Sequence, residues 1–220
     1  ATGYFMQPQD RVFQTPVGGH ESIAFADGSR IELSTDTVLR TRMTTAMRTV
    51  WLEKGEAYFQ VKHDAAHPFV VIAENHRITD LGTKFLVRRD PGRLEVALVE
   101  GRVRFDAPHS PSQSALLAPG DVVTATTSTM FVTRETKKSL ASELAWRHGA
   151  LIFDNMTLAD AAAEFNRYNS RKLIIADPAV AGMTIVGKFR TGDVEPFARI
   201  IRNVLGLNVE AKGDDFVISR

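Results

Sequence analysis

The chain has 220 residues, of which 44% are hydrophobic and 24% charged, a composition typical of a globular protein and not of a disordered one. Its 27 Lys and Arg residues nearly balance 26 Asp and Glu residues, so the charge favours neither a nucleic-acid-binding face nor a polybasic membrane patch. The chain has no cysteine, which excludes disulfides, thiolate catalysis and cysteine-bound metals.

A signal peptide would lie at the beginning of the sequence. Ala1–Tyr4 have no basic segment followed by an apolar one, so we expect no signal peptide. The sequence begins without Met, which suggests a fragment of a longer protein. No segment approaches the roughly 20 apolar residues that span a bilayer. We expect residues 1–10 to be a linker or disordered.

Residues 11–134 are expected to form a mainly β domain. Apolar residues alternate with polar ones in 22–26, 30–33 and 94–98, which is the period of a half-buried strand. Between such runs lie pairs typical of turns: Asp27-Gly28, Lys54-Gly55, Glu100-Gly101 and Pro119-Gly120. Asp-Gly predicts a type I′ hairpin, whose two central residues have positive φ. The spacing of turns favours stacked antiparallel hairpins in a sandwich or solenoid-like arrangement, with a polar loop at 109–114.

Residues 135–149 are interpreted as a charged linker with one or two possible helical turns, and residues 150–220 as a small α+β domain. Strands are predicted at 150–153, 173–175 and 184–189, with a closing hairpin around Gly213-Asp214. Two helices are predicted between them. Thr157 and Asp193 are expected to cap their N-termini, and Gly206 the C-terminus of the second.

The α+β region contains an internal repeat. The apolar face of the first helix is Leu158, Ala161, Ala162, Phe165 and Tyr168, and that of the second is Val194, Phe197, Ala198, Ile201, Val204 and Leu205. Two strand–helix–strand units of this kind predict both helices on one face of a sheet. We predict that emptying a core position, as in Phe165→Ala or Ile201→Ala, costs about 2–5 kcal/mol.

Ordered motifs in the β region resemble the FecR family of sigma-factor regulators. They are the apolar-DGS-x-V-x-L pattern at 26–33, L-x-x-G-E-A-x-F-x-V at 52–61, LGT-x-F-x-V at 81–87 and V-x-E-G-x-V around 99–103. The region after Trp146 resembles the short domain shared by secretins and the N-termini of TonB-dependent signalling transporters. Phe153, Leu158 and the Asn166-Arg167-Tyr168 end of the first helix carry this likeness.

The resemblance implies the periplasmic, signal-receiving part of a single-pass inner-membrane regulator. Its expected partners are the signalling domain of a TonB-dependent outer-membrane transporter, loaded with a ferric siderophore or similar ligand, and an extracytoplasmic-function sigma factor. The sigma factor would bind a cytosolic segment that this sequence lacks. No enzymatic activity, cofactor, metal, nucleic acid or direct small-molecule ligand is expected.

Candidate interface residues are Arg167, Tyr168, Phe189 and Arg190 in the α+β domain. Arg and Tyr are enriched at interface hot spots, although Arg167 and Tyr168 could equally stabilise the end of their own helix. An open sheet edge in such a domain could accept a partner strand.

Other polar groups have simpler interpretations than a reactive site. Glu56 and Glu100 could form an acid/base pair but more simply lie at turns or strand edges. His63, Asp64 and His67 fall in a loop, where the spacing does not align metal ligands. Trp51, Phe59, Phe69 and Phe85 are interpreted as core residues, with a carbohydrate-stacking platform as the alternative. The competing functions are a periplasmic carbohydrate-active or metal-dependent β-fold enzyme and an envelope assembly module.

Overall fold

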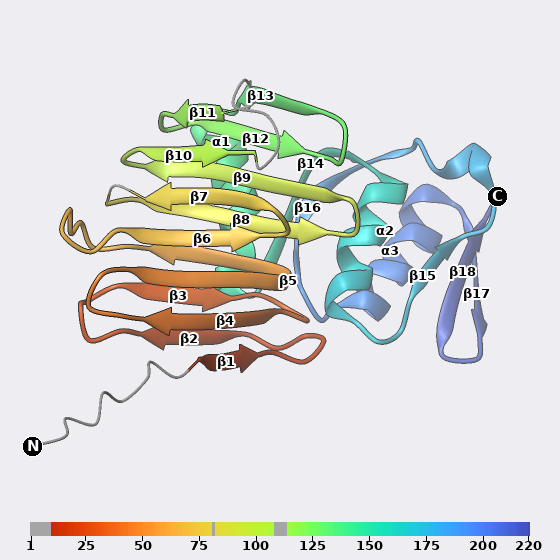
Figure 1. Ribbon diagram of the computed structural model, residues 1–220. Coiled ribbons are helices and arrows are strands. Elements are labelled where there is room, and N and C mark those ends of the chain that lie inside the picture. Colours follow the sequence, from red (N-terminus) through yellow and green to blue (C-terminus); the bar gives the residue numbers. More distant parts are fainter. Residues whose placement is uncertain (1–9, 81, 108–113) are drawn as a thin grey trace, which may run out of the picture. The chain divides into compact units, whose positions relative to one another are not determined.

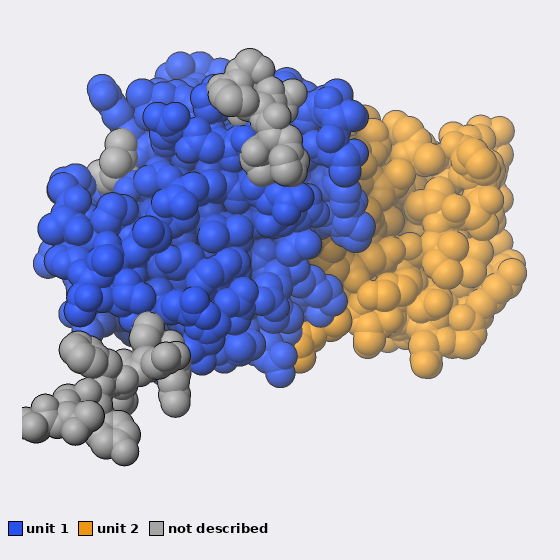
Figure 2. All heavy atoms as spheres, in the orientation of Figure 1, with its two compact units in different colours: residues 1–15, 21–140 blue, residues 16–20, 141–220 orange. Residues whose placement is uncertain are grey.

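The computed structural model describes residues 10–80, 82–107 and 114–220. The described part of the chain forms two compact units, the first made of residues through Thr15 and Glu21–Leu140, the second of Pro16–His20 and Ala141–Arg220 (Figure 2). The expected loop residues 109–113, the expected N-terminal linker up to residue 9 and Leu81 of the LGT motif lie outside the described residues. No helix in the described ranges is long and apolar enough to cross a membrane.

The first unit is built from strands (Figure 1). They are β1 (Arg11–Gln14), β2 (Glu21–Ala24), β3 (Arg30–Leu33), β4 (Val38–Met43), β5 (Arg48–Gln60), β6 (Phe69–Ala73), β7 (His76–Asp80), β8 (Lys84–Asp90), β9 (Arg93–Glu100), β10 (Val103–Asp106), β11 (Ser114–Leu117), β12 (Asp121–Ala125) and β13 (Met130–Arg134). The mainly β fold class expected for this region is confirmed.

After β5, successive hairpins alternate between two layers, with β6-β7 and β10-β11 in one and β8-β9 and β12-β13 in the other. One layer has the order β1-β4-β5-β6-β7-β10-β11 and the other β2-β3-β5-β8-β9-β12-β13, so that β5 belongs to both. The inward-facing side chains of both layers form one core, in which the Phe59 ring lies 4.8 Å from that of Phe85 and 6.2 Å from that of Phe69. The unit is therefore a stack of hairpins folded around a shared apolar interior.

Two expected turns have a different backbone from the one predicted. Lys54-Gly55 is not a turn, because β5 continues through it and changes from pairing with β4 and β6 to pairing with β3 and β8. Gly55 supplies this bend with a φ of 88°. At Asp27-Gly28 only Gly28 has positive φ, so the turn is not type I′. The Asp27 side chain instead accepts a hydrogen bond from the Ser29 amide, which favours a different type of turn.

The second unit confirms the small α+β domain. Its elements are η1 (Leu144–His148), β14 (Ala150–Thr157), α2 (Leu158–Tyr168), β15 (Leu173–Ile175), η2 (Pro178–Val180), β16 (Thr184–Arg190), α3 (Val194–Leu205), β17 (Asn208–Lys212) and β18 (Asp215–Ser219). Helix α1 (Lys137–Glu143) and η1 occupy most of the expected linker. The strands form two small sheets, β14-β16 and β15-β18-β17, where the sequence led us to expect one.

The two helices of this unit differ in how well they match their predicted faces. All five predicted residues of α2 are buried, and the Thr157 hydroxyl caps it by accepting the Asp160 amide at 3.1 Å. In α3, Val204 is 74% exposed, because it lies at the flank of the face in the last turn, and Asp193 makes no side-chain cap. Gly206 ends α3 with a φ of 68°, as predicted.

Candidate functional site

The end of α2 carries two of the candidate interface residues, Arg167 and Tyr168. Arg167 Nη1 donates to Glu164 Oε2 at 3.0 Å, and its guanidinium lies 5.4 Å from the centre of the Tyr168 ring. Tyr168 is only 7% exposed. Both side chains therefore have structural contacts within their own helix, which leaves little of Tyr168 accessible to a partner.

Phe189 on β16 belongs to an aromatic cluster in the core of the second unit. Its ring lies 5.4 Å from Phe153, 5.8 Å from Phe165 and 5.1 Å from Phe197. A Cβ on the neighbouring Gly187 would lie 2.9 Å from Phe189 Cζ, so the glycine makes room for this ring. Phe153 and Phe189 each precede the residue before the following helix, Thr157 or Asp193, by four positions, and the two rings pack against each other.

The outward side of β16 is the most accessible part of the predicted interface. Among the described residues this strand pairs only with β14, which leaves backbone groups on its other edge without a strand partner. Val186 is 67% exposed, and Lys188 and Arg190 are exposed and form no ion pair with any described residue. An edge with unpaired amides and two free cations can receive an extended segment that carries carboxylates.

In the first unit, the Asp27-Gly28-Ser29 motif serves the structure. Asp27 Oδ2 lies 2.6 Å from Arg48 Nη1, and Arg48 is buried. Arg48 also donates to the carbonyls of His67 at 2.8 Å and Lys62 at 3.2 Å. Burial alone would raise the pKa of Asp27, but hydrogen bonds from Ser29 and Arg48 outweigh it and lower this pKa below 3.8. The motif therefore fastens the β2–β3 hairpin to the loop between β5 and β6.

The structure does not bring the other reactive candidates together. Glu56 lies opposite Arg88 and Glu100 opposite Lys84, so the two residues lie on strands at either side of β8 and are offset by roughly 13 Å along it. That distance is too long for a carboxylate pair that acts on one bond. No group of metal-ligating side chains occurs in the described ranges.

His63, Asp64 and His67, which the sequence analysis interpreted as a loop and not as metal ligands, lie in a largely exposed loop. Asp64 Oδ2 lies 2.7 Å from His67 Nδ1, and this hydrogen bond lowers the pKa of Asp64. Asp64 also accepts the amides of Ala66 and His67, which is a side-chain-stabilised turn.

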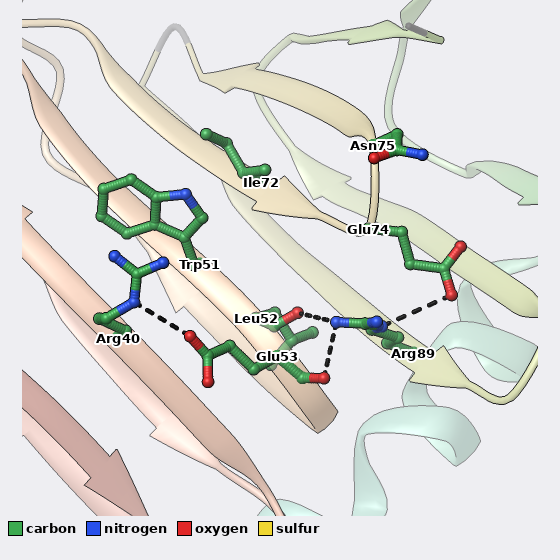
Figure 3. A pocket seen from close by; sticks show the side chains of 8 residues that line it. All are labelled: Arg40, Trp51, Leu52, Glu53, Ile72, Glu74, Asn75 and Arg89. Carbon is green, nitrogen blue, oxygen red and sulfur yellow. Dashed lines mark hydrogen bonds and ion pairs between the residues drawn. The ribbon is translucent and has the colours of Figure 1, made fainter.

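Of the four aromatic residues interpreted as core, three are core residues and one is not. Phe59, Phe69 and Phe85 are fully buried, whereas Trp51 is partly exposed on the outer face of the sheet. Trp51 lines a pocket of about 470 Å³ together with Arg40, Leu52, Glu53, Ile72, Glu74, Asn75 and Arg89 (Figure 3). The pocket lies where β5 passes from one layer to the other, which brings the end of β8 beside β4 and β6.

Contacts within the first unit fix the two guanidiniums of this pocket. Arg40 Nε donates to Glu53 Oε1 at 3.0 Å, and the Arg40 guanidinium stacks 4.0 Å from the centre of the Trp51 ring. Arg89 Nη1 donates to the carbonyls of Leu52 at 3.1 Å and Glu53 at 2.6 Å, while its Nε lies 3.5 Å from Glu74 Oε1. Figure 3 shows these contacts on opposite sides of the pocket.

Glu74 reaches Arg89 from a backbone conformation that favours glycine. Its φ is 54°, in the left-handed region, which costs a residue with a side chain roughly 1–3 kcal/mol. The tight connection between β6 and β7 therefore has a carboxylate at a position where glycine would have the lower conformational energy.

Sequence reasoning did not single out the charged residues of this pocket. Arg40, Glu74 and Arg89 lie outside the quoted motifs, and Glu53 occupies an unspecified position of the 52–61 motif. The one available signal was Glu74-Asn75, a short polar break between two apolar strands where a turn must form.

Comparison with known proteins gives a family match and similar crystal structures. Residues 11–104 match the FecR protein family. Two crystal structures of a protein from Parabacteroides distasonis ATCC 8503, described as a proposed anti-sigma factor, have TM-scores of 0.79 and 0.78 to this chain. Each is 22% identical and covers 96% of this chain and 99% of its own. At that identity the likeness establishes a shared fold. Curated proteins gave no match.

Proposed function

We propose that this chain, whose residues 11–104 are a FecR domain, is the periplasmic signal-receiving region of an anti-sigma regulator. In this proposal it binds the N-terminal signalling domain of a TonB-dependent outer-membrane transporter. It then relays a ferric-siderophore type of signal to an extracytoplasmic-function sigma factor, which binds a cytosolic segment outside this sequence. The chain acts by recognition and has no catalytic step.

The observation that carries the proposal is the combination of a FecR domain with a small α+β unit that contains two strand–helix repeats. The sequence of this second unit resembles the signalling domain of the expected partner. The whole-chain likeness to a proposed anti-sigma factor supports the same reading at the level of the fold.

The docking surface that we propose is the outer edge of β16. Main-chain hydrogen bonds along the edge would provide affinity, and Lys188 and Arg190 would select a segment that carries carboxylates. Arg190 is the accessible member of the predicted interface set, and the cluster around Phe189 holds the strand in place.

The test is a calorimetric titration of the full chain with the purified signalling domains of the source organism's TonB-dependent transporters. We expect one of them to bind, and the Lys188→Glu/Arg190→Glu double variant to raise its Kd at least about tenfold. Arg102→Glu is the matched control, because Arg102 is an exposed cation of the FecR domain with no ion pair to a described residue. Binding that survives the β16 charge reversal would move the docking surface elsewhere, and the absence of binding to every signalling domain would overturn the proposal.

A further inference from the structure

The pocket beside Trp51 has balanced charges. Two guanidiniums, Arg40 and Arg89, and two carboxylates, Glu53 and Glu74, line it. Each cation already has one of these carboxylates as a neighbour, at 3.0 Å for Arg40 and 3.5 Å for Arg89. An anionic ligand would have to compete with the glutamates, and a cationic ligand with the arginines. The pocket therefore favours a ligand without net charge.

A hydroxyl group can bind beside such a pair without displacing either partner. It donates one hydrogen bond to a carboxylate and accepts another from a guanidinium, and the Asn75 amide can do both. Each side of the pocket carries a donor and an acceptor, Arg40 with Glu53 on one and Arg89 with Glu74 on the other (Figure 3), so a ligand with several hydroxyls around its rim would meet both kinds of group on either side. The volume of about 470 Å³ lies within the range of small-ligand sites.

The pocket also has an apolar part. Trp51 and Ile72 are cross-strand neighbours on β5 and β6, and both are partly exposed. The C–H groups of a sugar ring can pack against such a pair, while its hydroxyls extend outwards to the polar groups. Arg40 stacks on the indole and holds the side chain in one orientation, which reduces the entropy lost on binding.

Glu74 completes the polar lining of the pocket. A two-residue hairpin connection such as Glu74-Asn75 itself calls for a positive φ, so the backbone angle of 54° belongs to the hairpin. What bears on the pocket is that this position carries a carboxylate facing Arg89, where glycine would satisfy the turn. We propose that the pocket binds a pyranose ring of a neutral oligosaccharide. The sequence alone led us to expect no small-molecule ligand, and this site is separate from the proposed docking edge on β16.

The chain suits a direct fluorescence test because it has two tryptophans, Trp51 in the pocket and Trp146, which is buried in the second unit. In a Trp146→Phe background, Trp51 is the only indole. The probes are chitotetraose, cellotetraose and maltotetraose, with glutarate and 1,4-diaminobutane as charged comparisons. We expect at least one tetrasaccharide to change the Trp51 emission saturably, with a Kd between about 10 μM and 10 mM.

Two variants separate binding from folding. Glu74→Gly should raise the Kd for the bound tetrasaccharide at least about tenfold while leaving the thermal midpoint unchanged or higher, because glycine accepts the positive φ. Asp36→Gly is the matched control. Asp36 also has a positive φ, 49°, and an ion pair, with Lys54 at 2.7 Å, but it lies outside the pocket. It should leave the Kd unchanged.

Three results would reject the proposal. The first is no saturable response to any of the three tetrasaccharides up to about 10 mM. The second is a stronger response to glutarate or diaminobutane, which would make the ligand a charged one. The third is a Kd that Glu74→Gly leaves unchanged.

Discussion

At the scale of single residues, the family motifs of the first unit explain its architecture. Asp27 and Ser29 bind Arg48, a buried cation that reaches two loop carbonyls. Gly101 packs so closely on the carbonyl of Gly82 that a Cβ there would lie 2.6 Å from its oxygen. These motif residues connect neighbouring hairpins. Their order along the chain therefore indicates the fold and does not indicate a reactive centre.

The Asp27–Arg48 pair gives a prediction about pH. Asp27→Asn should lower the free energy of unfolding by about 1–3 kcal/mol near neutral pH, because it removes the negative charge that pairs with the buried Arg48. The folded-state pKa of Asp27 is lowered, so its contribution is complete above the ordinary value of 3.8 and is lost as the pH falls through the folded value. The difference in the free energy of unfolding between wild type and variant, measured in urea, should therefore be constant at higher pH and decrease below about pH 3.8.

The exposed Asp64 provides the comparison for this experiment. Its pKa is also lowered, by the hydrogen bond to His67, but both side chains are more than 40% exposed. Asp64→Asn should change stability much less than Asp27→Asn, since water screens and replaces the lost contacts. Equal effects at the two sites would contradict a structural role for the buried pair.

At the scale of elements, β5 shows how one glycine changes a whole strand. The positive φ of Gly55 bends β5, and a Cβ at this position would meet Thr37 Cα at 2.7 Å and the Asp36 carbonyl oxygen at 2.9 Å. Gly92 has a similar φ of 73° but open space around it. Gly55→Ala should therefore lower the free energy of unfolding by more than Gly92→Ala does, where about 1 kcal/mol of backbone strain is expected. Chemical denaturation of both variants measures the difference. Equal losses of unfolding free energy would show that close packing at Gly55 does not set the bend of β5.

Helices α2 and α3 show the difference between a predicted and an observed apolar face. Phe165 is fully buried and its ring stacks 4.4 Å from that of Phe197, so Phe165→Ala should cost about 2–5 kcal/mol. Val204, which the same periodicity assigned to the core, is exposed, and Val204→Ala should change stability by less than about 0.5 kcal/mol. Thermal unfolding of the two variants checks both values. A large loss of stability in Val204→Ala would instead show that Val204 belongs to the buried face, as the periodicity predicted.

At the scale of the whole molecule, the chain does not divide at a single point. Pro16–His20 belong to the second unit although the strands on either side of them belong to the first. A Cβ on Gly18 would lie 3.0 Å from the Tyr168 carbonyl oxygen, and the His20 ring lies 5.7 Å from that of Trp146. This early segment is therefore part of the folded second unit, which a fragment beginning after residue 140 would lack.

The contribution of this segment can be measured through His20. In a Trp51→Phe background, Trp146 reports the unfolding of the second unit. His20→Ala should lower its stability by about 0.5–1 kcal/mol, at the low end for an aromatic pair because His20 is exposed. His148→Ala, an exposed histidine of the same unit, should have no effect of that size. If the two variants behave alike, residues 16–20 contribute little to the second unit.

The sequence by itself determined the local features of this protein. Alternation and turn residues predicted the β region, and the periodicity of 158–168 predicted the buried face of α2, because strand and helix periods depend only on neighbours along the chain. The ordered motifs, which are also local in the sequence, predicted the match of residues 11–104 to the FecR family.

Only the tertiary structure decided the features that depend on distant residues. Periodicity could not reveal that Gly55 bends a strand shared by two layers, that Val204 is exposed, or that residues 16–20 join the second unit. Nor could it assemble Arg40, Trp51, Glu74 and Arg89 into one pocket. Those outcomes depend on which strands pair and which surfaces are covered, because the burial of a side chain is set by neighbours that are distant along the chain.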